Sequence, residues 1–166
     1  MNQKVDSIAV VLRKAFQVEV DGFTFYSMAA ERAAKPATQK LFARLARDET
    51  EHQAYIKAVM RRYEDLGAGS FRFDRRDPDL AEFSSEIFTG DFKEQVQGEV
   101  FETGALSIGI QLETNAVAFF GDAAEEASDP QVSGFYRFLA DWEGSHLRIL
   151  QQLYDSIRAD PWPEKD

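Results

Sequence analysis

The sequence predicts an all-α protein, a four-helix bundle made of two helical hairpins joined by a long connection. Three observations predict this class. Apolar residues recur at the three- and four-residue spacing of amphipathic helices in four long segments. Strand-like alternation is scarce, and no motif of a tight β-hairpin is found. The second pair of segments repeats the first after a shift of 94 residues, as expected if one helical hairpin is present twice.

The first hairpin is expected over about residues 6–66 and the second over about residues 104–159, within a single domain spanning 1–166. Pro36 and Pro130 are each expected to open a second helix, because proline suits the first helical position. Asp129 directly precedes Pro130 and is a good capping residue. The 94-residue shift places Pro36 on Pro130, so both hairpins are expected to turn at equivalent places.

The connection between the hairpins, residues 67–103, has a weaker helical pattern. Glycine, serine and proline mark loops in its first part. Short helices are expected at residues 84–88 and 91–101. A connection of this length can cross the bundle from one end to the other.

Composition narrows the kind of protein. The 166 residues suit one domain, and a hydrophobic fraction of 44% supports a real core. No apolar run reaches the roughly 18 residues of a membrane-spanning helix, and no signal-peptide pattern is found, so we expect no membrane partner and a cytoplasmic location. The net charge of −10 argues against nucleic acid as a partner. Cysteine is absent, so a metal site must use His, Asp and Glu.

The repeat carries a candidate metal site. The chain has two histidines, each lying three residues after a glutamate, and the 94-residue shift superimposes these two Glu-x-x-His pairs. Residues three apart share one face of a helix. A further glutamate in the first helix of each hairpin lies at about the same height, roughly 20 Å from the turn. The candidate ligands, which are also the candidate catalytic residues acting through the metals, are Glu19, Glu49, His52, Glu113, Glu143 and His146.

All six candidates occupy core-facing positions, where four unpaired carboxylates would be very costly. Two divalent cations would balance four negative charges, and imidazole nitrogen suits iron, zinc or manganese. Four glutamates with two Glu-x-x-His pairs are the ligand set of di-iron and di-manganese bundles. A single Glu-x-x-His pair is common on solvated helices, and one core histidine is more often structural. A purely solvated or structural role, however, does not explain why six such residues recur with identical spacing in both hairpins.

Several neighbours of the candidate ligands have alternative interpretations. Gly22 and Ala116 follow Glu19 and Glu113 by one turn, and their small side chains could leave room for an oxidant. Tyr26 is expected to pack in the core, with a hydrogen bond to the site as the alternative. Asp48 is either an exposed acid or a residue that orients a ligating histidine. Trp142 occupies the equivalent place in the second hairpin.

These motifs resemble the ferritin-like superfamily and, within it, the rubrerythrin-related proteins. The resemblance covers about residues 12–63 and 104–157, through the stretches EVDGFTFY, ETEH, ETNAVAFF and EGSH. It implies a ferritin-like four-helix bundle with a di-iron centre, with zinc or manganese as alternatives to the two iron ions. The resemblance implies that the bridging pair includes Glu49 and Glu143, or Glu19 and Glu113. By similarity to ferritins, Glu49 and Glu143 would bridge the metals, and Glu19 and Glu113 would be terminal ligands.

The resemblance implies a non-haem di-iron oxidoreductase of peroxidase or ferroxidase type, connected with oxidative stress. Hydrogen peroxide or O2 would be the oxidant, an external protein would donate electrons, and the chain would form a homodimer. Whether residues 67–103 let subunits exchange hairpins stays open. Ile110 stands where founding rubrerythrins have an extra glutamate, and the six-ligand set is similar to bacterioferritin ferroxidase centres. The alternatives are Fe(II) handling without repeated turnover and a non-catalytic, zinc-binding bundle.

Overall fold

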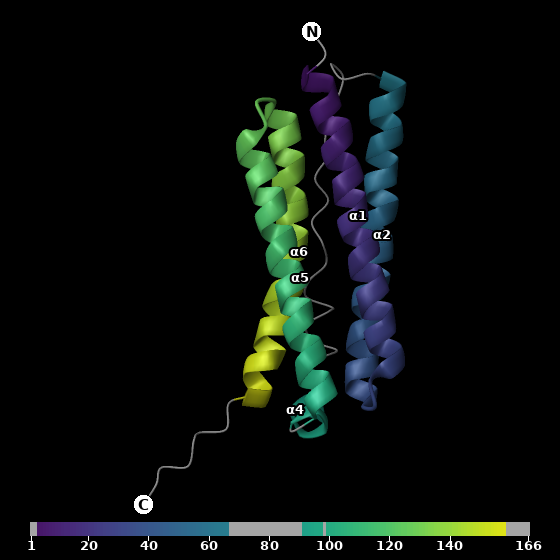
Figure 1. The fold of residues 1–166 in the computed structure, drawn as a ribbon, viewed down its shortest axis with the longest axis vertical. Helices are drawn as coiled ribbons and strands as arrows, with labels where there is room; N and C mark the ends of the chain where they lie inside the picture. Colours follow the sequence, from purple (N-terminus) through teal and green to yellow (C-terminus); the bar gives the residue numbers. More distant parts are fainter. Residues whose placement is uncertain (1–2, 67–90, 98, 159–166) are drawn as a thin grey trace, which may run out of the picture.

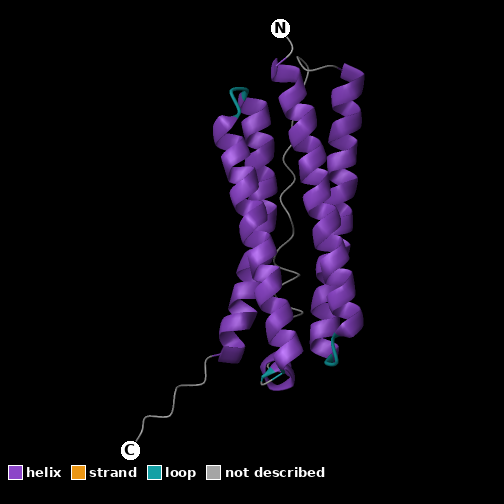
Figure 2. Ribbon diagram, in the orientation of Figure 1, coloured by secondary structure: helices purple, strands orange, loops and turns teal. Residues whose placement is uncertain are grey.

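The computed structural model describes residues 3–66, 91–97 and 99–158. In this part of the chain the elements are helices, and no strand occurs (Figure 2). The predicted all-α class is confirmed. The helices are α1 (Gln3–Arg32), α2 (Pro36–Leu66), α4 (Asp91–Val96), α5 (Val100–Glu126) and α6 (Pro130–Arg158). The helix expected at residues 84–88 lies outside the described residues.

The four long helices form a bundle of two hairpins (Figure 1). Helix α1 packs along α2, and α5 packs along α6. Between the hairpins, α1 lies beside α5. The α1–α2 turn and the α5–α6 turn lie at opposite ends of the bundle, so the two hairpins are related by a pseudo-twofold axis. This arrangement confirms the predicted bundle of two pseudo-symmetric hairpins.

The helix starts follow the local sequence. Pro36 is the first residue of α2, and Pro130 is the first residue of α6. Asp129 Oδ1 accepts a hydrogen bond of 2.8 Å from the backbone N–H of Gln131, as expected for a helix cap. Pro130 and this cap together set the start of α6.

One expected boundary is wrong. The sequence predicts a short helix over residues 91–101, but the structure divides this stretch between α4, which ends at Val96, and α5, which begins at Val100. Glu99 lies between them with extended backbone, at φ −82° and ψ 114°. The second hairpin therefore begins slightly before residue 104. The helical pattern is weak over residues 67–103, so periodicity alone does not locate this break.

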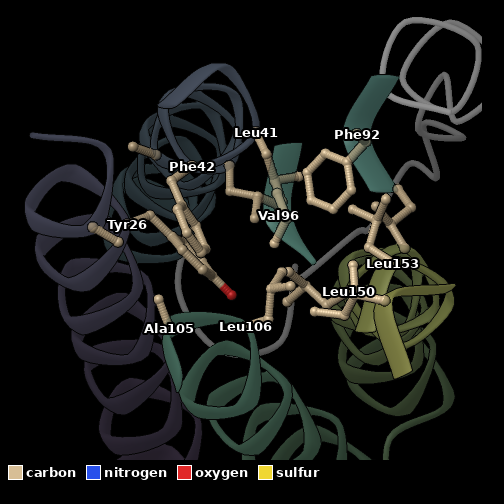
Figure 3. Close-up of a cluster of buried hydrophobic side chains, with 14 residues drawn as sticks. Tyr26, Leu41, Phe42, Phe92, Val96, Ala105, Leu106, Leu150 and Leu153 are labelled. Carbon is tan, nitrogen blue, oxygen red and sulfur yellow. The ribbon is translucent and has the colours of Figure 1, made fainter. Parts of the chain in front are cut away.

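Two apolar clusters fill the core on either side of the bundle's middle. The first contains Tyr26, Phe42, Leu106 and Leu150, and α4 adds side chains to it (Figure 3). The second is built around side chains at the other end of the bundle, including Leu12, Ile56, Phe120, Phe135 and Leu139. Burial of apolar surface contributes about 25 cal/mol per Å² and is the main source of stability here. Between the two clusters lies a layer of buried polar side chains.

Helix α4 and the start of α5 are joined to the α1–α2 turn by polar contacts. The backbone N–H of Ala34 donates to Glu102 Oε1 at 3.0 Å, and that of Ala37 donates to Gln95 Oε1 at 3.1 Å. Lys35 Nζ lies 2.8 Å from Glu99 Oε1. These contacts tie the second hairpin to one end of the first. Among the described helices, none combines the length and apolar character needed to cross a membrane.

Candidate metal centre

The structure brings all six predicted site residues together in the middle of the bundle. Each is almost fully buried, with relative exposure between 0% and 5%. Each of the four long helices supplies at least one of them: Glu19 from α1, Glu49 and His52 from α2, Glu113 from α5, and Glu143 and His146 from α6.

Their side-chain atoms form two overlapping groups, in each of which one ligand atom per residue lies within 4.8 Å of the others. We call the first the His52 group; it consists of Glu19, Glu49, His52 and Glu143. We call the second the His146 group; it consists of Glu49, Glu113, Glu143 and His146. The two Glu-x-x-His glutamates belong to both groups, whereas the other four residues belong to one group each.

In the His52 group, three carboxylates converge on one imidazole nitrogen. His52 Nδ1 lies 2.9 Å from Glu19 Oε2, 3.2 Å from Glu143 Oε1 and 3.4 Å from Glu49 Oε2. A single N–H can make one good hydrogen bond, so it does not satisfy three acceptors. The arrangement is that of ligand atoms directed at one point.

The His146 group repeats this convergence with the opposite oxygens of the shared glutamates. His146 Nδ1 lies 3.5 Å from Glu113 Oε1, 3.6 Å from Glu49 Oε1 and 3.7 Å from Glu143 Oε2. Glu49 and Glu143 therefore each direct one carboxylate oxygen to each group. That is the geometry required of carboxylates that bridge two cations.

Burial and crowding perturb the proton affinities of these groups. Burial, followed by the negative charge of Glu143, raises the pKa of Glu113 to about 8. The same two causes raise the pKa of Glu19. Burial also opposes ionisation of Glu49, but the neighbouring imidazoles of His146 and His52 outweigh it and hold its pKa well below the usual range. Glu19 and Glu113 therefore tend to keep their protons in the metal-free protein, and bound cations would displace these protons.

The surroundings of both histidines raise their pKa values and so favour the protonated imidazole. Burial alone lowers the pKa of an imidazole, but the carboxylates around His52, with Glu143 first, raise its pKa well above the ordinary value. Hydrogen bonding to Asp48, Glu113 and Glu49 does the same for His146. In the folded chain without metal, protonated imidazoles supply part of the positive charge that these carboxylates need.

The donor set fits a pair of divalent cations. Three buried carboxylate oxygens, Glu19 Oε1, Glu49 Oε2 and Glu143 Oε1, have no hydrogen-bond partner. A buried carboxylate oxygen without a partner is costly unless a cation coordinates it. Four carboxylates and two imidazole nitrogens also match the charge and ligand preferences of first-row divalent metals.

Two side chains outside the six contact the His146 group. The hydroxyl of Tyr26, which is fully buried, donates a short hydrogen bond to Glu113 Oε1. Asp48 Oδ2 lies 3.6 Å from His146 Nε2, the ring nitrogen directed away from the group, and Arg44 Nε donates to Asp48 Oδ1 at 2.9 Å. Tyr26 thus combines core packing with the alternative, a hydrogen bond to the site. Asp48 is a partly buried residue facing a candidate ligand.

Trp142 lies against the other histidine. Its ring stacks on His52 at a centroid distance of 4.1 Å and an angle of 8°. Phe138 and Tyr55 pack around the indole at 4.6 and 5.3 Å. This contact was not foreseen from the sequence. The repeat could have indicated this contact. Trp142 is equivalent to Asp48, and each of the two contacts the histidine of the other hairpin.

A cavity of about 230 Å³ opens between α1 and α5 and reaches the carboxylates Glu49, Glu113 and Glu143. Gly22 and Ala116 line it beside these candidate ligands. Gly22 has a second role that sequence reasoning missed. A Cβ at this position would lie 2.9 Å from Glu49 Oε1, so the absence of a side chain makes space for a shared glutamate.

Fold and site together define a class, the four-helix bundles with a buried carboxylate and histidine cluster that could bind metal. Comparison with protein families agrees with this class and is more specific. The Rubrerythrin family matches residues 11–154, so this chain belongs to the rubrerythrin family. Neither the curated proteins nor the solved structures contain a significant match. Membership in this family suggests a di-iron protein.

Proposed function

We propose that this chain is a di-iron redox protein that reduces hydrogen peroxide or O2 with electrons from an external donor protein. One observation carries the proposal: Glu49 and Glu143 each direct one oxygen to the His52 group and one to the His146 group. This geometry is what two adjacent cations require. We assign Glu49 and Glu143 as bridging ligands, with Glu19, His52, Glu113 and His146 as the remaining ligands.

Two ferrous ions held here would supply the two electrons, and the Lewis acidity, needed to reduce one H2O2, with two protons from solvent, to two waters. The chain's own residues provide the surroundings. The cavity beside Gly22 and Ala116 gives a small oxidant access to the carboxylates. Buried apolar side chains of the two core clusters flank the site on either side. Tyr26 holds Glu113 in place through its hydroxyl.

These 166 residues contain no cysteine and therefore no rubredoxin-type iron site. The proposal therefore includes an external donor of electrons. We also propose that the chain works as a homodimer, as the resemblance to rubrerythrin-related proteins implies.

A second candidate function is single-turnover oxidation and handling of Fe(II). Its support is Ile110, which is partly buried and packs against the first apolar cluster, where founding rubrerythrins have a further glutamate. The six ligands are therefore symmetric in number between the hairpins. That is the donor set associated above with ferroxidase centres.

The test is anaerobic loading with Fe(II), followed by addition of H2O2 or O2 in separate experiments. Ferric absorbance and oxidant consumption with an external reductant are measured. Repeated, rapid consumption supports the redox enzyme, and a single oxidation followed by iron release supports iron handling instead. A site that binds zinc but gives no oxidation with iron would favour a non-catalytic bundle.

Variants connect the result to the site. Glu49→Gln removes a ligand shared by both groups and is expected to lower oxidant consumption by at least 100-fold. Glu51→Gln is the matched control, because Glu51 is an exposed acid on the same helix. Undisturbed binding of two metal ions in the Glu49→Gln variant would contradict the assignment of Glu49 as a bridge.

A further inference from the structure

The two metal positions have matching ligands but unequal surroundings. The 94-residue repeat pairs each ligand with its counterpart, so the ligands alone predict two equal positions. The residues packed against the ligands, in contrast, are not all of the same type at equivalent places in the two hairpins. Among the equivalent places that differ, two bear on one metal position each: Asp48 with Trp142, and Tyr26 with Phe120.

The first difference concerns the histidines. Asp48 Oδ2 faces His146 Nε2, and Arg44 holds the same carboxylate from its other side. At 3.6 Å this carboxylate makes an ion-pair contact with the imidazole and favours a proton on Nε2, which leaves the Nδ1 lone pair for the metal position. Its counterpart Trp142 stacks on the face of His52. An indole has an N–H donor and no acceptor for a histidine N–H, so Trp142 does not provide the same support.

The second difference concerns Glu19 and Glu113, the glutamates that belong to one group each, and it also favours the His146 group. The Tyr26 hydroxyl donates to Glu113 Oε1. The residue equivalent to Tyr26 in the second hairpin is Phe120, which is fully buried and has no hydroxyl. Correspondingly, Glu19 Oε1 has no hydrogen-bond partner. Both polar supports thus fall on the His146 group, and both apolar counterparts fall on the side of the His52 group.

We infer that the two metal positions are unequal: the position at Glu113 and His146 is preorganised and binds a divalent cation more tightly than the position at Glu19 and His52. The inference rests on the proposed metal-binding function. Asp48 and Tyr26 are positioning residues, since they act through His146 and Glu113. Loss of such supporting groups typically lowers metal affinity by about 10- to 100-fold.

Two binding steps alone do not prove inequality, because the charge of a first cation weakens binding of a second even at identical positions. The decisive comparison is between Glu19→Gln, which alters the His52 group alone, and Glu113→Gln, which alters the His146 group alone. Equal positions would make these two variants equivalent. Unequal positions would make them differ in the tighter step.

The full-length, metal-free protein is titrated anaerobically with Co(II), and binding is followed by visible absorption and by calorimetry. Glu19→Gln is expected to keep the tighter step within about threefold of the unmodified protein. Glu113→Gln is expected to weaken that step by at least about 10-fold. Equal effects of the two variants, or loss of the tighter step in Glu19→Gln, would overturn the inference while leaving metal binding intact. Absence of any two-ion binding would instead overturn the proposed function as well.

The positioning residues are tested in the same titration. Asp48→Asn is nearly isosteric and is expected to weaken the tighter step by about 10- to 100-fold while the weaker step changes little. Tyr26→Phe is expected to act in the same direction. Asp48→Glu keeps a carboxylate and should restore part of the affinity, and Glu51→Gln controls for the loss of one negative charge. Equal weakening of both steps in Asp48→Asn would contradict the positioning role.

Discussion

At the scale of single residues, Gly22 shows how closely the helix backbones approach the shared carboxylates. An added Cβ would lie 2.9 Å from Glu49 Oε1 and 3.0 Å from Glu49 Cδ, closer than packed atoms tolerate. Glycine in a helix costs about 1 kcal/mol relative to alanine. Its presence in α1 is explained by the space that Glu49 occupies.

Gly22→Ala is therefore expected to displace the Glu49 carboxylate and to weaken binding of both metal ions by at least 10-fold. Isothermal titration with Co(II) measures this loss. The matched control is Gly104→Ala on α5, where an added Cβ meets no atom within 4 Å. The control should leave metal binding unchanged and raise the free energy of unfolding by about 0.5–1 kcal/mol. Unchanged affinity in Gly22→Ala would show that Glu49 has room to move.

At the scale of elements, the contacts around the α1–α2 turn anchor the first hairpin to α4 and α5. Glu102 is a buried carboxylate at 1% exposure, and it accepts a hydrogen bond from the backbone of Ala34. The nearby pair of Lys35 and Glu99 is largely solvated, with side chains 34% and 41% exposed. Exposed ion pairs contribute little, whereas hydrogen bonds to buried charged groups contribute more.

Glu102→Ala is expected to lower the free energy of unfolding by about 1–3 kcal/mol, because it removes the partner of the Ala34 N–H and leaves a gap. Urea denaturation of the metal-free protein measures the change. Glu99→Gln, which removes only the exposed ion pair, should give no measurable change. If both variants unfold at the same urea concentration, Glu102 does not anchor the turn.

At the scale of the whole molecule, the polar layer makes the metal-free bundle sensitive to pH. Burial, with the charge of Glu143, raises the pKa of Glu113 to about 8, so the folded protein keeps a proton that the unfolded chain loses near pH 4.5. Stability therefore falls as pH rises from about 4.5 to 8. His52 and His146 act in the same direction, since carboxylates overcome burial and raise their pKa values. Their contribution is complete below about pH 6.5 and is lost above it.

Glu49 and Asp48 affect the pH dependence of stability in the opposite direction. Interactions with the histidines lower the pKa of each carboxyl despite burial. Their contribution is present above about pH 4 and is lost on acidification, so it stays nearly constant between pH 5 and 8. The net expectation is a metal-free protein whose melting temperature falls between pH 5 and pH 8.

Differential scanning calorimetry at several pH values tests this expectation. Divalent metal should reverse the trend, because cations replace the protons in the layer. At a free metal concentration of about 1,000 times the dissociation constant, the gain is about 4 kcal/mol, or roughly 8–16 °C for a chain of this size. Glu113→Gln should flatten the pH dependence. A melting temperature that rises from pH 5 to 8 without metal would contradict the assignment.

Much of this architecture could be predicted from the sequence because helices follow local rules. The apolar spacing, Pro36, Pro130 and Asp129 predicted the hairpins, and the 94-residue repeat predicted six residues that the structure indeed brings together. The break at Glu99 could not be predicted this way, because the helical pattern is weak over the connection in which it lies.

The sequence by itself determined the bundle, its pseudo-symmetry and the six buried polar residues, because each depends on spacing along a regular helix. Only the tertiary structure decided which oxygen of Glu49 and Glu143 meets which histidine, and which side chains support each group. Asp48 and His146 lie on different hairpins, as do Trp142 and His52. Such contacts depend on how two hairpins dock, which helical periodicity within either hairpin does not specify.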